Sequence, residues 1–351
     1  MKRVIAIAMQ KGGVGKTTTA VNLAASLAAT KRRVLLIDMD PQGNTTMGSG
    51  IDKSQLKCST CEVLLGECQL ADAFVPIEHG AGFTLLPANQ DLTAAEVRLL
   101  TLPIGRETKL RQALAPKRND FDLVLIDCPP ALNMLTVNAL VAADSVLIPM
   151  QCEYYALEGL SALLSTVEQI RAAVNPQLAI EGVLRTMFDP RNNLANEVSA
   201  QLVAHFGDKV FRTVIPRNIR LAEAPSFGKP ALFHDKESRG ALAYLALAGE
   251  MIRREEESTG AVRNLTAMTS ATAASPVTAP TAPTASAANA TAANTTNTAN
   301  TTNAANAGNA VDTNGVDTAT TAGPATNPAS GSAMSAPVSA APAPQAEDRS
   351  R

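Results

Sequence analysis

A glycine-rich segment between an apolar strand and a helix most constrains the fold of this chain. The run Val4–Met9 is apolar throughout and has the length of a strand. The segment Lys11–Thr18 follows it, and the spacing of apolar residues predicts a helix over Lys16–Ala29. A strand that passes through glycines into a helix N-terminus is the context of a phosphate-binding loop. The sequence therefore predicts an α/β core with an anion site after its first strand.

Apolar runs of strand length and helical patterns alternate along the rest of the first 257 residues. Fully apolar strands that alternate with helices are typical of a parallel sheet covered on both faces. We therefore expect an α/β fold of the P-loop NTPase type, with a single doubly wound, mainly parallel sheet. The further predicted strands are Arg33–Asp38, Phe83–Leu86, Leu123–Asp127, Ser145–Met150, Ile180–Met187 and Val210–Ile215. The further predicted helices lie near Leu157–Val174, Asn196–Phe206 and Gly240–Glu257.

The composition of the chain changes abruptly after residue 257. All aromatic residues lie at or before Tyr244, and the last 94 residues consist mainly of Ala, Thr, Asn, Ser and Pro. Such a segment has no periodic apolar face with which to offset the entropy of ordering it. We expect one globular domain over residues 1–257 and a disordered low-complexity tail over residues 258–351.

Charge and cysteine content exclude several classes of protein. The 351 residues carry 30 basic and 32 acidic groups, a net charge of −2, so nucleic-acid binding would need a local basic patch. No apolar run is long enough for a membrane helix, and the short apolar start does not predict a signal peptide. Five cysteines, an odd number, favour reduced thiols and a cytoplasmic setting. Cys58, Cys61 and Cys68 lack a matching second pair, so we expect thiols there rather than a metal site.

The glycine-rich loop carries the groups that phosphate chemistry requires. Its glycines let the backbone approach the phosphates, and the helix N-terminus adds partial positive charge. Lys16 can reach the outer phosphates, and the Thr17 hydroxyl can ligate Mg²⁺ beside them. The predicted nucleotide-binding residues of the loop are Lys11, Gly12, Gly13, Val14, Gly15, Lys16, Thr17 and Thr18.

Two predicted strands end in aspartate, at the sheet edge where ligands of α/β proteins bind. Asp127 can hold a water on Mg²⁺, and Asp38, at the same edge, is expected to act on the metal through water as well. Asp40 lies past the strand end and could orient or activate the attacking water. The alternative is that Asp40 only stiffens the turn before Pro41.

Several motifs, in order, resemble those of the deviant Walker A ATPases, in particular the ParA/Soj partitioning proteins. The resemblance covers residues 1 to about 255; the tail is a departure, and Gln10 stands where many relatives have glycine. The similar segments are the loop Lys11–Thr18, the second acidic motif Asp38–Asn44, the Walker B segment Leu125–Pro130, and the segments Gln151–Gly159 and Val214–Pro225.

The resemblance implies an ATP-dependent enzyme that hydrolyses ATP to ADP and phosphate with Mg²⁺. Catalytic roles are implied for Lys11, Lys16, Asp40 and Asp127. Lys11 would cross into the partner's site in an ATP-bound homodimer; the alternative is that it stays solvated or contacts its own phosphates. Pro216 and Asn218 would lie near adenine, with Glu153 a weaker candidate for a nucleotide contact.

The resemblance also implies partners. Arg191 and Arg220 match positions that bind the DNA backbone without sequence preference, although either could be an ordinary solvated arginine. A ParB-type centromere-binding protein would stimulate hydrolysis, and the ATPase would be cytoplasmic and associated with the nucleoid. No membrane partner is expected, because Met251–Glu257 is heavily charged rather than amphipathic. The alternative from another class is a metabolic ATP-dependent ligase of the dethiobiotin-synthetase type.

Overall fold

The strand that precedes the glycine-rich loop lies inside an eight-stranded sheet in this computed structural model, which describes residues 2–78, 82–154 and 156–273. The strand order is β3-β4-β2-β5-β1-β6-β7-β8, and every neighbouring pair is parallel except β3 and β4. The mainly parallel sheet is therefore confirmed. The strands are β1 (Arg3–Ile7), β2 (Val34–Asp38), β3 (Val75–Ile77), β4 (Phe83–Leu86), β5 (Leu123–Asp127), β6 (Ser145–Gln151), β7 (Ala179–Phe188) and β8 (Val210–Pro216).

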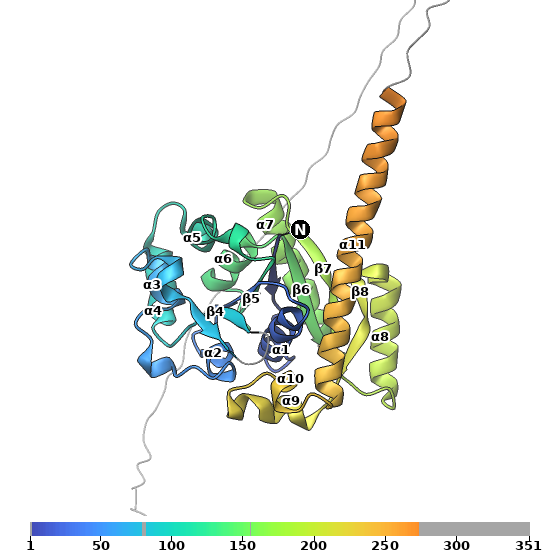
Figure 1. Ribbon diagram of the computed structural model, residues 1–351, viewed down its shortest axis with the longest axis horizontal. Coiled ribbons are helices and arrows are strands. Elements are labelled where there is room, and N and C mark those ends of the chain that lie inside the picture. The colour runs from blue at the N-terminus through green and yellow to red at the C-terminus, as the bar shows by residue number, and fades with distance from the viewer. Residues whose placement is uncertain (1, 79–81, 155, 274–351) are drawn as a thin grey trace, which may run out of the picture. The chain divides into compact units, whose positions relative to one another are not determined.

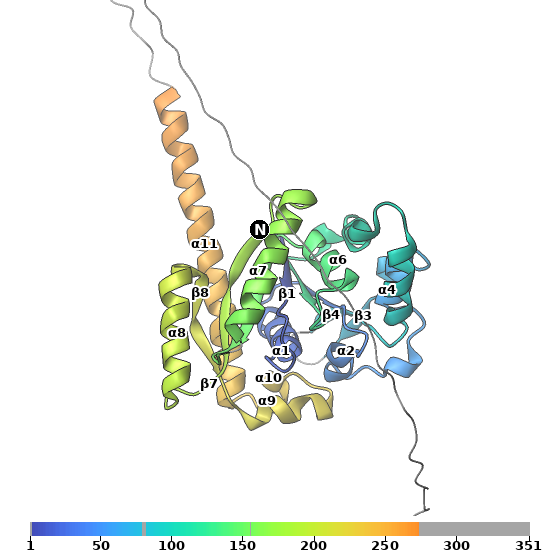
Figure 2. The same cartoon turned by 180° about the vertical axis from the view of Figure 1, so that it is seen from behind.

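Helices cover both faces of the sheet (Figure 1). α1 and α11 pack on one face, and α6, α7 and α8 pack on the other, which Figure 2 shows from behind. The helices are α1 (Lys16–Ala29), α2 (Asn44–Gly48), α3 (Thr60–Leu65), α4 (Leu92–Thr101), α5 (Lys109–Leu114), α6 (Met134–Ala142), α7 (Ala156–Ala173), α8 (Asn193–Phe206), α9 (Ile219–Glu223), α10 (Ala231–His234) and α11 (Arg239–Ala273).

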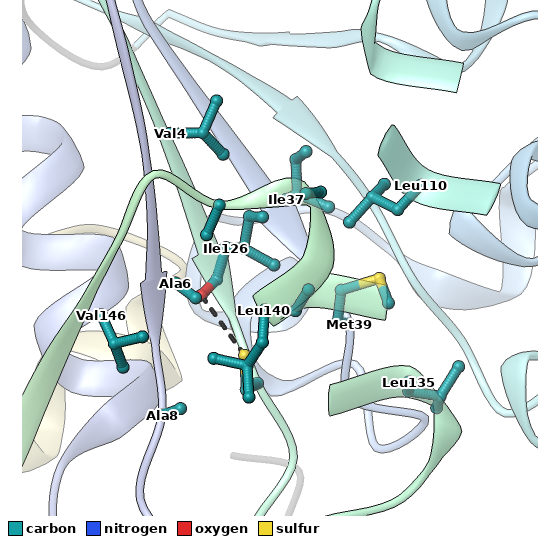
Figure 3. Close-up of a cluster of buried hydrophobic side chains, with 14 of the residues drawn as sticks. Val4, Ala6, Ala8, Ile37, Met39, Leu110, Ile126, Leu135, Leu140 and Val146 are labelled. Carbon is teal, nitrogen blue, oxygen red and sulfur yellow. Dashed lines mark hydrogen bonds between the residues drawn. The ribbon is translucent and has the colours of Figure 1, made fainter. Parts of the chain in front are cut away.

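The central strands are apolar on both faces because each face meets a layer of helices. Neighbours along β1 alternate: Ala6 belongs to one buried cluster and Ile7 to the other. Ala6 lies in register with Ile126 of β5, which in turn pairs with Ile37 of β2. Figure 3 shows these three side chains among the buried residues of the first cluster. This double burial fixes the strand ends, and with them the positions of the polar residues that follow.

The edge strand β3 and the end of the last helix differ from the predictions. The antiparallel edge strand β3 was not predicted, because three residues containing a proline give almost no periodic signal. Helix α11 extends beyond the predicted end at Glu257, to Ala273. The rest of the predicted tail lies outside the described residues, and its disorder stays a prediction. None of the helices in the described part of the chain is long and apolar enough to cross a membrane.

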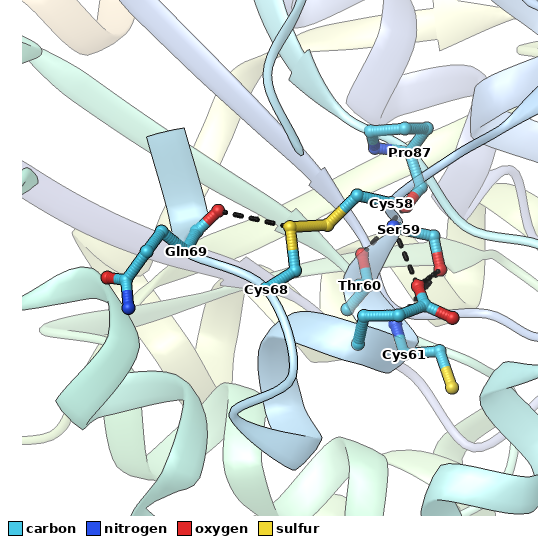
Figure 4. The surroundings of a disulfide bond; sticks show 8 residues. Cys58, Ser59, Thr60, Cys61, Cys68, Gln69 and Pro87 are labelled. Atoms are coloured by element: carbon cyan, nitrogen blue, oxygen red, sulfur yellow. Dashed lines mark hydrogen bonds between the residues drawn. A yellow bond between two sulfur atoms is a disulfide. The ribbon is translucent and has the colours of Figure 1, made fainter. Parts of the chain in front are cut away.

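The prediction that all cysteines are reduced is wrong for one pair. A disulfide joins Cys58 and Cys68, whose Cα atoms are 6.5 Å apart, while Cys61 between them is a buried free thiol (Figure 4). Sequence spacing alone does not show which cysteines approach each other, since bonding depends on where the chain turns. The bond closes the segment around α3, and Thr60 of that helix donates to the carbonyl of Asp38 at 2.8 Å.

Candidate functional site

The loop between β1 and α1 has the backbone geometry of an anion site. Gly13 and Gly15 have φ of +74° and +88°, a left-handed conformation that a side chain strains. Gly15 is the N-cap of α1, and no side chain caps the helix there. The first amides of α1 can therefore point at a bound phosphate, as the sequence predicts.

Lys16 is buried at the first position of α1, with 7% of its surface exposed. Its Nζ donates to the carbonyl of Lys11 at 3.0 Å, so the ammonium group lies under the loop. Burial lowers the pKa of Lys16, and the nearby carboxylates of Asp127 and Asp40 act in the opposite direction. A buried ammonium beside a loop of amides is a strong site for a phosphate oxygen.

Asp127 lies at the carboxyl end of β5 and binds two threonines. Its Oδ2 accepts hydrogen bonds from Thr17 at 2.8 Å and from Thr45 at 2.7 Å. Its Oδ1 is buried and finds no hydrogen-bond partner among the described residues. Burial is the main cause that raises the pKa of Asp127 to about 6. A free carboxylate oxygen beside a threonine hydroxyl is a donor set that fits hydrated Mg²⁺.

Asp38 lies beside Asp127 on the neighbouring strand, with which it is in register. Its Oδ2 accepts from the backbone N of Thr46 at 2.9 Å and from the Thr46 hydroxyl at 2.7 Å. Burial, followed by the charge of Asp127, raises the pKa of Asp38 to about 8. Because Oδ2 of Asp38 already accepts two hydrogen bonds from Thr46, we expect Asp38 to act on a metal indirectly rather than as a direct ligand.

The sequence analysis missed Thr45 and Thr46, which bind the two buried carboxylates. Both lie on α2, directly after the acidic motif that contains Asp38 and Asp40. The signal was present as two hydroxyl residues after Gly43, but the pairing of Thr45 with Asp127 of β5 and of Thr46 with Asp38 of β2 depends on the turn. Gly43 has φ of +60°, and a Cβ there would lie 2.6 Å from a backbone oxygen, so only glycine makes this turn.

Asp40 follows the end of β2 and is nearly buried, with 8% exposure. Its Oδ1 accepts from the backbone N of Gln42 at 2.9 Å, and its own N donates to Asp38 at 3.1 Å. The first contact is the turn-stiffening bond that the alternative predicts. This bond occupies only Oδ1 of Asp40, and Asp40 lies at the same edge of the sheet as the phosphate loop. The predicted role of Asp40 in orienting the attacking water stays a prediction.

The side chain of Lys11 has an acidic partner in this structure. Its Nζ forms an ion pair with Glu153, 2.7 Å from Oε2, just after the end of β6. Both side chains are partly exposed, at 31% and 45%. Glu153, a weaker candidate for a nucleotide contact, is thus a counter-ion of Lys11 in this structure.

Pro216 and Asn218, the predicted adenine neighbours, line a cavity of about 280 Å³ beside the phosphate loop. Gly15 and Thr18 of the loop region and Tyr244 of α11 line the same cavity. The Asn218 side chain accepts from the backbone N of Leu221 at 3.2 Å and thereby caps α9. The cavity connects the loop with the end of β8, which is the arrangement a nucleoside attached to phosphates needs.

The two predicted DNA-binding arginines follow the ends of neighbouring strands, and each has acidic partners. Arg191, after β7, forms a two-point ion pair with Asp189, at 2.9 and 2.8 Å. Arg220, on α9, pairs with Glu223 at 2.8 Å and with Asp235 at 3.2 Å. Both arginines are exposed, but neither is an uncompensated positive charge in this structure.

Residues 2–180 match a family model described as an AAA domain. The chain is 52% identical over 257 residues to the chromosome partitioning protein ParA of Caulobacter vibrioides, covering 73% of this chain and 96% of that protein. It is 53% identical over 256 residues to the chromosome-partitioning ATPase Soj of Thermus thermophilus, covering 73% and 98%.

Among solved structures, the chain resembles one named cobyrinic acid a,c-diamide synthase from Mycobacterium smegmatis, with bound ADP and magnesium. The identity is 40%, the TM-score is 0.64, and the match covers 74% of this chain and 97% of that one. Sequence and fold therefore point to one family of nucleotide-dependent proteins.

Proposed function

Because the chain belongs to the ParA/Soj family of chromosome-partitioning ATPases, we propose that its phosphate site is an ATP-driven switch for DNA binding. The protein is an ATPase that uses ATP and Mg²⁺. In the proposed cycle, ATP binding assembles a homodimer, the dimer binds duplex DNA without sequence preference, and hydrolysis releases it. The observation that carries the proposal is the buried cluster of Lys16, Thr17 and Asp127 at the end of the central strands.

Each residue of this cluster has a proposed role in phosphoryl transfer. Lys16 and the loop amides bind the outer phosphates and stabilise the charge that develops on them. Mg²⁺, when bound, would supply charge that neutralises the phosphate oxygens. Thr17 and the free oxygen of Asp127 are placed to hold the metal and its water, with Asp38 in support. Asp40 orients the attacking water.

The ion pair of Lys11 with Glu153 supports a role for Lys11 outside its own site. An exposed ion pair of this kind contributes less than about 1 kcal/mol, so Lys11 can exchange it at little cost. Phosphate oxygens of a nucleotide in the partner subunit would attract the released ammonium more strongly. We assign Lys11 to the partner's site in the ATP-bound homodimer.

The base and the DNA contacts complete the proposal. The cavity next to Gly15 is assigned to the adenine base, with Pro216 and Asn218 on its wall. Arg191 and Arg220 are assigned to the DNA backbone, which must replace their present acidic partners. Dimerisation doubles the number of such contacts, and so couples ATP to DNA affinity.

A ParB-type centromere-binding protein is the proposed stimulator of hydrolysis, and the nucleoid in the cytoplasm is the proposed location. Both proposals rest on the membership of the chain in the partitioning family, and no described surface of the chain carries them. The second candidate function, an ATP-dependent metabolic ligase, is favoured only by the name of the Mycobacterium smegmatis structure. The higher identity to partitioning ATPases favours the first candidate.

The decisive experiment measures binding to nonspecific duplex DNA without nucleotide, with ADP, and with ATP and Mg²⁺, each at two salt concentrations. We expect binding only with ATP, and a marked loss of affinity at the higher salt concentration, because phosphate contacts release counter-ions. Intact nucleotide binding without DNA binding in any state would reject the switch and favour the ligase.

A further inference from the structure

Met187 has an unusual backbone conformation beside the proposed base cavity. Its φ is +49°, in the left-handed region, although it is not glycine. Among the described residues, the other non-glycine residue with positive φ is Lys31, which follows the end of α1, where chains commonly leave a helix. Met187 instead lies inside β7, where this conformation is unfavourable and persists only if the surroundings impose it.

The pairing of β7 with β8 shows how the surroundings impose it. Arg185 pairs with Val214 and Phe188 with Pro216, so β7 uses one residue more than β8 over the same length. On the other side, β7 pairs with β6 in unbroken register from Gly182 to Thr186. The extra residue is therefore absorbed at Met187, as in a β-bulge.

A second contact fixes the bulge against the phosphate loop. The hydroxyl of Thr186 donates to the carbonyl of Val14 at 2.8 Å, and both residues are buried. The methyl group of Thr186 also lies 3.9 Å from the position of a Cβ on Gly15. The strand end and the loop thus form one packed unit.

The bulged segment borders the cavity assigned to the base. Thr186 and Met187 are neighbours in sequence, and both line this cavity, together with Pro216 and Tyr244. In a regular strand, successive side chains point to opposite faces, and a bulge interrupts that alternation. The strained backbone at Met187 therefore puts an apolar residue at the wall of this cavity.

We propose that Met187 is a specificity-determining residue that packs its thioether against the purine base of the bound nucleotide. This inference rests on the proposed assignment of the cavity to the base. A polarisable thioether interacts favourably with an aromatic face, and methionine adapts its shape to a planar ligand. The unfavourable backbone conformation at Met187 is explained if it places the thioether where a regular strand would not.

The test compares the dissociation constants of ATP and inorganic tripolyphosphate, each with Mg²⁺, because tripolyphosphate lacks a base. The variants are M187N and M187G, since Asn and Gly both tolerate the left-handed conformation and both remove the thioether. We expect ATP to bind about 10-fold more weakly to both variants, the effect of losing an apolar contact in a pocket. We expect tripolyphosphate to bind within about 2-fold of the wild-type value.

The outcomes separate the inference from the proposal beneath it. If wild-type protein binds ATP no more tightly than tripolyphosphate, the base assignment of the cavity fails, and the inference with it. If wild-type protein discriminates but both variants discriminate equally well, only the role of Met187 is refuted. Equal weakening of both ligands would show that Met187 shapes the phosphate loop instead, which also overturns the inference.

Discussion

The two ends of the proposed DNA switch hold their charges in opposite ways. At the phosphate end, Lys16, Asp38 and Asp127 are buried on strands and a helix that the core fixes. On the surface after β7 and β8, Arg191 and Arg220 are exposed and pair with neighbouring carboxylates. Buried charges are expensive to desolvate and hold one geometry, whereas exposed pairs are weak and exchange partners easily. The phosphate end suits chemistry, and the arginine surface suits reversible contact.

The largest effect should come from Lys16→Ala. Removing a buried ammonium leaves the outer phosphates without their fixed cation and the nearby carboxylates uncompensated. We expect ATP affinity to fall at least about 1,000-fold, or about 4 kcal/mol, in an equilibrium binding measurement. The matched control is Lys57→Ala at an exposed position, which should bind ATP normally. If a correctly folded Lys16→Ala protein bound ATP with normal affinity, the buried ammonium group would not be the main phosphate-binding group.

Asp40→Ala should separate binding from chemistry. If Asp40 orients the attacking water, the variant binds ATP and dimerises but hydrolyses ATP about 100-fold more slowly. Single-turnover rates with ATP in the bound state measure this directly. A normal rate would mean that the bond to the backbone of Gln42 is the whole role of Asp40.

Arg220→Glu should affect the exposed end alone. We expect dimerisation to be retained and the affinity for nonspecific DNA to fall about 10-fold, with a shallower salt dependence. Arg171→Glu is the matched control, because Arg171 has a similar exposure and also pairs with a carboxylate three residues away, Glu168. Equal DNA affinity of the two variants over several salt concentrations would remove Arg220 from the interface.

The smallest effect should come from Glu153→Gln, which releases Lys11 from an exposed ion pair. We expect the protein concentration for half-maximal ATPase activity to fall by less than about 5-fold, because such pairs contribute under about 1 kcal/mol. Glu168→Gln breaks a comparable exposed pair on α7 and should change nothing. A higher concentration requirement in Glu153→Gln would instead indicate that Glu153 contacts the nucleotide.

Much of this arrangement could be predicted from local sequence patterns. The central strands β1, β2 and β5 were predicted because burial on both faces makes them almost entirely apolar. Asp38 and Asp127 could be placed at one sheet edge because both follow such strands. Helices α2 to α6 were not predicted, since most of them are short and their residues are positioned by contacts rather than by a periodic pattern.

Pairing between distant segments set the limit of prediction. The binding of Thr45 to Asp127 joins residues 82 positions apart, and the contact of Lys11 with Glu153 joins residues 142 apart. No periodicity encodes such pairs. The disulfide between Cys58 and Cys68 was missed although the two cysteines are only 10 residues apart, because their approach depends on how the chain turns around α3.

The sequence by itself determined the type of sheet, the phosphate loop and the identity of the groups that can act on phosphates. These depend on local rules: apolar runs form buried strands, and glycines permit the left-handed turns at Gly13 and Gly15. The tertiary structure alone decided which charges are neutralised, and it placed the strained Met187 beside the cavity that we propose for the base. Those outcomes depend on register, burial and distance between segments, which exist only once the strands have paired.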